Sequence, residues 1–108
     1  MNTISNYVQL IGKLGRDVEF RPLNNGNAMA RLRVATKEVF RETDGDKRIV
    51  TTWHNVVAWG KIAEMMQVML KKGAPVLVQG KLQHRLVGEG EARHLRTEVI
   101  VNEFRLLN

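Results

Sequence analysis

The sequence predicts an all-β domain with a small α content, in which five strands close a barrel and one helix covers one end. Three observations predict this fold class. Five segments have the period-two alternation or the bounding turn residues of strands. One segment has an apolar stripe at helical spacing. The helix falls between the third and fourth strands, and the order β-β-β-α-β-β in a chain of this length suits one barrel domain, 1–108.

The first strand is predicted over residues 8–13. Gly12 and Gly15 lie at its end, and glycine there indicates a sharp bend or a close approach of two backbones. Pro22 and the Asn-Asn-Gly-Asn run at 24–27 then predict a turn, because these residue types favour turn conformations.

The second strand, 28–40, has the clearest alternation. Its even-numbered residues from Ala28 to Thr36 are predicted to face the core, and its odd-numbered residues from Met29 to Lys37 are predicted to face outward. The outward set includes three cations, which are Arg31, Arg33 and Lys37.

The helix is predicted over residues 61–72. Gly73 is expected to supply a left-handed C-cap, and Lys71 and Lys72 suit the negative end of the helix dipole. The apolar stripe is expected to plug the barrel core rather than to form a binding groove, because methionine fills irregular gaps. The stripe consists of Ile62, Met65, Met66, Met69 and Leu70.

The remaining strands are bounded by turns. The polar stretch 41–48 contains an Asp-Gly pair and predicts a hairpin loop into the third strand, 49–59. The fourth strand, 75–86, is joined through the Gly-Glu-Gly hairpin at 88–90 to the fifth strand, 94–106. This order of elements matches the five-stranded OB-fold, with the helix as the cap of the barrel.

The composition excludes several classes of protein. The chain has no cysteine, so disulfides, iron–sulfur clusters and thiolate zinc sites are excluded, and we expect a reducing compartment. No stretch approaches the roughly 18 apolar residues of a spanning helix and no signal peptide is visible, so a cytoplasmic protein is expected. The net charge of +6 favours an acidic partner, foremost nucleic acid, although a basic surface also serves solubility alone.

Reactive side chains are too scattered to predict an active site. His54, His84 and His94 lack the paired spacing that binds zinc, and the Asp-Gly-Asp turn at 44–46 lacks the rest of a calcium loop. The glutamates at 89–91 lie at a hairpin tip that cannot hold them at catalytic spacing. We therefore expect no catalytic residue, no metal and no cofactor.

The aromatic residues indicate a partner more directly. Trp53 and Trp59 have equal parity on the third strand, so a regular strand puts them on one face, roughly 20 Å apart. Phe40 ends the neighbouring strand, and the three outward cations of that strand are expected on the same side. Unpaired bases stack on such rings while cations hold the phosphates. The alternative is that both tryptophans pack in the core.

Several sequence blocks occur in the order in which one known family carries them. Residues 6–19 contain a Gly-x-Leu-Gly-x-Asp-x-Glu turn, and Asn25-Gly26 with Ala35-Thr36 resembles a second-strand block. The most specific block is 52–64, Thr-Trp-His-Asn-Val-Val-Ala-Trp-Gly-Lys-Ile-Ala-Glu. Further blocks lie at 71–73, 80–82 and 97–101. Across nearly the whole chain they resemble the bacterial single-stranded DNA-binding proteins of the SSB family.

The resemblance implies an OB-fold that binds and protects single-stranded DNA in replication, repair and recombination. It further implies a homotetramer in the bacterial cytoplasm, associated with the nucleoid. By position, Trp53 and Trp59 match base-stacking aromatics, Phe40 matches a third, and His54 matches a position implicated in subunit assembly. The matching basic positions near the DNA are Lys61, Lys71, Lys72 and Arg85, and Arg31 and Arg33 are cations where relatives are often polar.

The chain departs from the family's pattern in three places. Val87 stands where many relatives carry another stacking tryptophan. The hairpin 88–92 is short, which we expect to alter wrapping between subunits. The sequence ends at Asn108 without the flexible linker and acidic tip that recruit partner enzymes. We expect a truncated core or a tailless paralogue from a plasmid, phage or accessory system, without tail-dependent protein partners.

Two other functions stay open on the sequence alone. A protein–protein assembly factor on the same fold would place its tryptophans at a partner interface. An OB-fold that binds RNA would distinguish it from DNA through the 2′-hydroxyl, although no residue of the sequence indicates such a contact.

Overall fold

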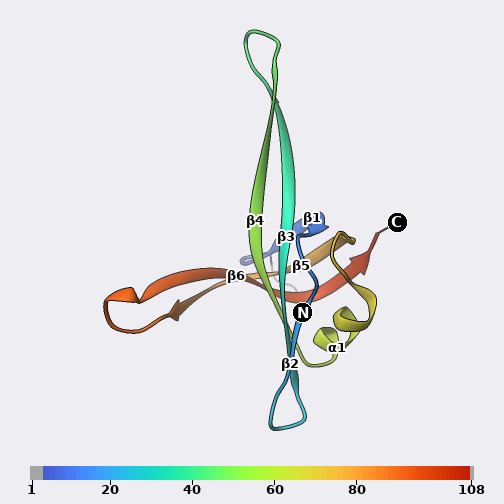
Figure 1. Ribbon diagram of the computed structural model, residues 1–108, viewed down its shortest axis with the longest axis vertical. Coiled ribbons are helices and arrows are strands. Elements are labelled where there is room, and N and C mark those ends of the chain that lie inside the picture. The colour runs from blue at the N-terminus through green and yellow to red at the C-terminus, as the bar shows by residue number, and fades with distance from the viewer. Residues whose placement is uncertain (1–3, 108) are drawn as a thin grey trace.

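The computed structural model describes residues 4–107, which form one strongly curved sheet and one α-helix (Figure 1). The predicted all-β class and the order of the five long strands and the helix are confirmed. The elements are β1 (Val8–Leu14), β2 (Glu19–Pro22), β3 (Ala28–Arg41), β4 (Lys47–Trp59), α1 (Gly60–Met69), β5 (Pro75–Val87), the 3₁₀ helix η1 (Gly90–Ala92) and β6 (His94–Leu106).

Five strands close a barrel in the spatial order β1-β3-β4-β6-β5. All neighbouring pairs are antiparallel except β4 and β6, which run parallel where Val56 pairs with Val99. The circle closes where Lys13 and Leu14 at the end of β1 pair with β3. This arrangement is the five-stranded OB-fold barrel that the element order predicted.

Two glycines let the strands approach closely enough to close this barrel. A Cβ atom at Gly12 would overlap the carbonyl oxygen of Ala35, and one at Gly80 would overlap the carbonyl oxygen of Ile100. The close backbone approach predicted at Gly12 is therefore confirmed. Any larger residue at either position would push two paired strands apart.

The barrel core is made by the face of each strand that the alternation predicted. Ala28, Ala30, Leu32 and Val34 of β3 are all buried, as the period-two pattern requires. They pack against side chains of β4, β5, β6 and α1, the largest of which is the fully buried Met66. Met29 lies on the outward face, as its parity predicts, but its neighbours leave it only 7% exposed.

The helix ends earlier than predicted. It covers Gly60–Met69 rather than 61–72, and Leu70 is extended and buried in the core. Gly73 is consequently not a C-cap. It adopts its φ of 86° in the turn 71–74 after the helix, in which the Ala74 N–H donates to the carbonyl of Lys71. Burial of Leu70 ends the helix, because the chain must turn there to enter β5.

The expected apolar stripe of the helix packs only in part. Met66 and Leu70 enter the core together with Ala63, whereas Met65 and Met69 remain 47% and 42% exposed. The helix therefore presents a narrower face to the barrel than the stripe of five residues predicted. No helix in the described part of the chain is long and apolar enough to cross a membrane.

Four strands extend beyond the barrel as two hairpin arms, one formed by β3 and β4 and the other by β5 and β6 (Figure 1). The arms leave the barrel in different directions, which gives the molecule extents of 57 × 42 × 29 Å. A short strand that was not predicted, β2, pairs with the barrel end of β3.

Replacing Met66 by alanine is expected to lower the free energy of unfolding by about 2–5 kcal/mol, because it leaves a cavity in a close-packed core. Met65→Ala on the exposed side of the same helix is the matched control and should change it by less than about 0.5 kcal/mol. Urea denaturation followed by circular dichroism measures both. Equal losses in the two variants would contradict the packing described here.

Candidate nucleic-acid interface

The outward face of β3 and β4 carries both tryptophans. The two strands pair without a shift from Met29–Trp59 to Arg41–Lys47, so side chains alternate strictly between the faces. The predicted common face of Trp53 and Trp59 is confirmed. We call this surface the tryptophan face; it comprises Met29, Arg31, Arg33, Trp53, Asn55, Val57 and Trp59, and is joined by Arg85, Arg96 and Glu98 from β5 and β6.

Trp53 lies at the end of the face toward β1. Its ring rests against Gly15, where a Cβ atom would overlap it, and it remains 49% exposed. The guanidinium carbon of Arg33 lies 5.5 Å from the ring centroid, which is cation–π distance. Backbone and guanidinium thus orient the indole while half of it stays open to solvent.

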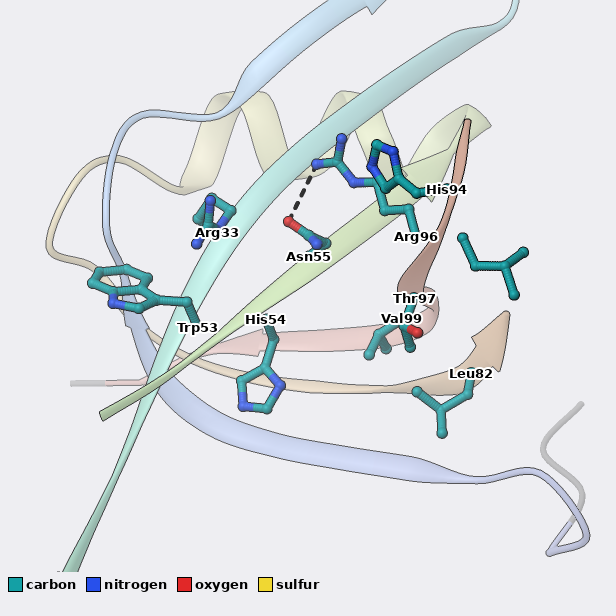
Figure 2. Close-up of a pocket in the computed structure, with 10 residues that line it drawn as sticks. Arg33, Trp53, His54, Asn55, Leu82, His94, Arg96, Thr97 and Val99 are labelled. Atoms are coloured by element: carbon teal, nitrogen blue, oxygen red, sulfur yellow. Dashed lines mark hydrogen bonds between the residues drawn. The ribbon is translucent and has the colours of Figure 1, made fainter. Parts of the chain in front are cut away.

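Three hollows meet at Trp53. One of about 180 Å³ lies between the ring, Gly15 and Arg33, and one of about 620 Å³ extends toward Lys37 and Gly73. The third, of about 580 Å³, lies in the fork between the two hairpin arms (Figure 2). An indole exposed to three adjoining hollows is well placed for a planar ligand.

Trp59 marks the other end of the face. It is 47% exposed and lines a hollow of about 230 Å³ with Arg31, Val57 and Glu98. The floor of this hollow is apolar, because Val57 and Met29 are both buried there. Arg31 and Arg33 project from β3 between the two tryptophans, so cations separate the two aromatic plates.

A buried carboxylate lies beneath the cations of the face. Glu98 on β6 is only 3% exposed, and each of its oxygens accepts a hydrogen bond of 3.1 Å from Arg85. The Arg85 hydrogen bonds hold the pKa of Glu98 below its usual range against the opposing effect of burial. Arg96 lies 3.7 Å from the same carboxylate and donates a hydrogen bond of 3.2 Å to the Asn55 side chain.

Figure 2 shows Arg33, Asn55 and Arg96 on one side of β4 and His54 on the other. His54 is half-buried, and its Nε2 lies 2.9 Å from the Thr36 hydroxyl. Burial lowers the pKa of His54, because a charged imidazolium is poorly solvated there. The residue predicted for subunit assembly therefore has the opposite parity to Trp53 on β4, although both residues line the fork hollow.

Phe40 does not join the tryptophans. In the unbroken register it has the opposite parity to Trp53 and lies near the tip of the β3–β4 arm, with the Arg48 guanidinium 5.4 Å from its ring centroid. On the tryptophan side of that arm the corresponding residues are Lys37, Val39 and Ile49. Phe40 is 42% exposed, so its ring is available, but on the other face of the ribbon.

The predicted basic residues divide into three groups. Arg31 and Arg33 lie on the tryptophan face, and Arg85 is bound to Glu98 there. Lys61 is the second residue of α1 and lies two residues after Trp59. Lys71 and Lys72 lie in the turn beside Gly73, and the Lys72 backbone N–H donates to Asp17.

Sequence reasoning missed Glu98 and Arg96 as members of this site. The available signal was weak: Glu98 directly precedes the apolar run 99–101 and lies two residues from Arg96, hence on the same face. Val87, where relatives carry a tryptophan, is half-buried on β5 opposite His94. No group of three or more potential metal ligands occurs among residues 4–107.

Comparisons with known proteins agree with this geometry. The sequence model of the Single-strand binding protein family matches residues 5–107. Single-stranded DNA-binding protein 1 of Chlorobaculum tepidum is 36% identical over 104 residues, which are 94% of this chain and 64% of the relative. The single-stranded DNA-binding protein of Neisseria meningitidis is 37% identical over 103 residues, covering 94% of this chain and 59% of the relative. The chain thus spans about three-fifths of the length of these relatives.

Two solved structures have the same fold. An SSB of Plasmodium falciparum in complex with ssDNA superposes with a TM-score of 0.87 at 31% identity, over 100% of both chains. A deletion mutant of the single-stranded DNA binding protein from Thermus aquaticus superposes with a TM-score of 0.83 at 29% identity. That match covers 95% of this chain and 50% of the Thermus chain.

The lowered pKa of His54 predicts a loss of stability in mild acid. Below the unfolded pKa of about 6.5, the unfolded chain binds a proton that the folded chain binds only at lower pH, so the free energy of unfolding falls. His54→Gln should reduce the fall between about pH 7.5 and pH 5.5, and His84→Gln, at an exposed site, should not. Urea denaturation at both pH values measures this, and an equal acid loss in all three proteins would contradict it.

Proposed function

Because the chain belongs to the single-strand binding protein family, we propose that it binds and protects single-stranded DNA during replication, repair and recombination. The observation that carries the proposal is the pair of half-exposed tryptophans on one face with arginines between them. The protein acts by binding alone, in the cytoplasm and on the nucleoid. Relatives named for single-stranded DNA binding support the same partner.

Base stacking supplies the sequence-tolerant part of the interaction. Trp53 and Trp59 receive bases in the hollows beside them, because every unpaired base offers a π-face. Alanine substitutions in such proteins, with SSB OB-folds as the established example, cost about 1–3 kcal/mol per base. Phe40 is a third platform for a strand that continues around the β3–β4 arm.

Phosphate contacts supply the ionic part. Arg31 and Arg33 lie between the stacking platforms, so they meet the backbone that links successive bases. Lys61 extends the cationic path past Trp59, and Lys71 and Lys72 extend it past the hollow beside Trp53. Arg85 contributes from the tryptophan face, where it is bound to Glu98. These contacts carry no sequence information, which suits general protection of exposed strands.

The same fold supports self-association into a homotetramer. Within residues 4–107, β1 pairs with β5 along its length but with β3 only at Lys13 and Leu14. An unpaired strand edge is a template for another chain, and the exposed side chains of Tyr7 and Ile11 lie along it. His54 contributes to assembly from the half-buried face of β4.

Removing the stacking rings tests the function. Trp53→Ala and Trp59→Ala should each weaken binding of labelled oligo-dT by about 5- to 150-fold, the equivalent of 1–3 kcal/mol. Fluorescence anisotropy measures the affinity, and Val68→Ala on the exposed helix surface is the control. The wild-type affinity should also fall with salt, with a log–log slope of about −0.7 per phosphate neutralised.

Three outcomes would contradict the proposal. Unchanged affinity in the folded double variant would remove the stacking assignment. Tighter binding to matched RNA or duplex DNA would assign another nucleic acid. No binding by the wild-type protein would instead favour a protein–protein assembly role.

The tetramer has its own test. Sedimentation equilibrium should give four times the 12.3 kDa chain mass. His54→Lys should lower that mass, because burial of the lysine ammonium group in an interface costs hydration free energy and weakens the assembly. His84→Lys, at an exposed site, should leave the mass unchanged. A wild-type mass of one chain, or a His54→Lys tetramer as stable as wild type, would reject this assembly.

A further inference from the structure

We propose that Glu98 is an internal counter-anion of the tryptophan face, which holds Arg85 and Arg96 in place and competes with DNA phosphates for the charge of Arg85. The inference rests on the proposed binding of single-stranded DNA. It adds a positioning residue of opposite charge to a surface whose ligand is a polyanion.

The burial of Glu98 is the first reason. It is 3% exposed, and it is the one buried charged residue among residues 4–107. A carboxylate is rarely buried unless it is paired, because the loss of hydration is costly. Here both oxygens are paired, so the strand can carry an ionised group beneath its surface.

The contacts of the carboxylate are the second reason. Arg85 reaches it with two parallel hydrogen bonds of 3.1 Å, from Nε to Oε1 and from Nη2 to Oε2. This bidentate arrangement fixes the plane of the guanidinium. It also keeps Glu98 ionised at neutral pH, since the pKa of the carboxyl group is lowered. Arg85 is therefore largely neutralised before any phosphate arrives.

The position of the cluster is the third reason. Glu98 and Arg85 line the hollow beside Trp59, and Arg96 lines the fork hollow beside Trp53. Arg96 connects the two, because it lies 3.7 Å from Glu98 and donates to Asn55 between the tryptophans. The carboxylate thus orients cations at both stacking positions from a single buried point.

Two arginines of the tryptophan face, Arg31 and Arg33, form no ion pair with Glu98. The buried Nε atoms of Arg31, Arg33 and Arg96 have no hydrogen-bond partner in the described part of the chain, but only Arg96 of the three lies within 4 Å of the Glu98 carboxylate. Arg31 and Arg33 are therefore less compensated by Glu98 than Arg85, which is bound to it through two hydrogen bonds.

The salt dependence of binding measures this competition. Glu98→Gln keeps the shape and one acceptor but removes the charge, so Arg85 becomes free for a phosphate. The log–log salt slope for oligo-dT should steepen by about 0.7, the value of one additional phosphate on a single strand. Between about 50 mM and about 200 mM salt this adds about a threefold loss of affinity, with tighter binding at the lower concentration.

A matched control separates local from general charge effects. Glu103→Gln removes the same charge from the same strand, where Glu103 forms an exposed pair with Arg105. Its salt slope should equal that of the wild type. A slope change of equal size in Glu103→Gln would overturn the proposal, because net charge alone would then explain it.

A double variant keeps the test decisive if Glu98→Gln alone folds poorly. Arg85→Gln combined with Glu98→Gln replaces a neutral ion pair by a neutral amide pair, so its slope should return to the wild-type value. A slope shallower than wild type by about 0.7 would overturn the proposal, since Arg85 would then have been fully available to phosphate. An unchanged slope in folded Glu98→Gln would overturn it as well.

The failure of this inference is distinguishable from failure of the proposed function. If the wild-type protein binds oligo-dT with a measurable salt slope and Glu98→Gln does not steepen it, only the role of Glu98 is rejected. If the wild-type protein does not bind single strands, the proposed function is rejected and the role of Glu98 falls with it.

Discussion

The antiparallel pairing of β3 with β4 runs without a shift from Met29–Trp59 at the barrel to Arg41–Lys47 at the tip of the arm. The common face of the two tryptophans and the arginines between them depends on that register. A slip of one residue would turn Trp53 and Trp59 toward the core and would expose Val56, because neighbouring side chains point to opposite faces. The buried even-numbered residues of β3 oppose such a slip, since each would lose its place in the core.

The two faces of this sheet differ in composition: one packs in the barrel core and the other carries the arginines. Behind it, small and branched apolar residues pack closely enough to close a narrow barrel, helped by Gly12 and Gly80 where backbones meet. In front, several arginines gather on one surface and repel one another. The buried carboxylate of Glu98 offsets part of that repulsion, as does the contact of Arg33 with Trp53. A polyanion bound to the tryptophan face would neutralise the remaining positive charge.

The sequence pattern predicted most of the fold, and its failures have identifiable causes. β2 was missed because a four-residue strand ending in proline is too short to alternate. The helix was predicted too long because Leu70 continues the helical period, although it is buried in an extended conformation where the chain turns toward β5. Met29 was assigned to the outward face by parity and lies there, but neighbouring elements cover it.

Among the site residues, the sequence by itself determined which aromatics and cations share the face of β3 and β4, because strand parity is a local property of the chain. By this parity the sequence placed Trp53, Trp59, Arg31 and Arg33 on one face. Only the tertiary structure decided that Phe40 lies on the opposite side of its ribbon and that Glu98 binds Arg85 beneath the surface. The position of Phe40 depends on a register that stays unbroken to the tip of the β3–β4 arm, and Arg85 meets Glu98 across the β5–β6 hairpin. Cross-strand pairing and packing set both registers, and the alternation along one strand does not encode them.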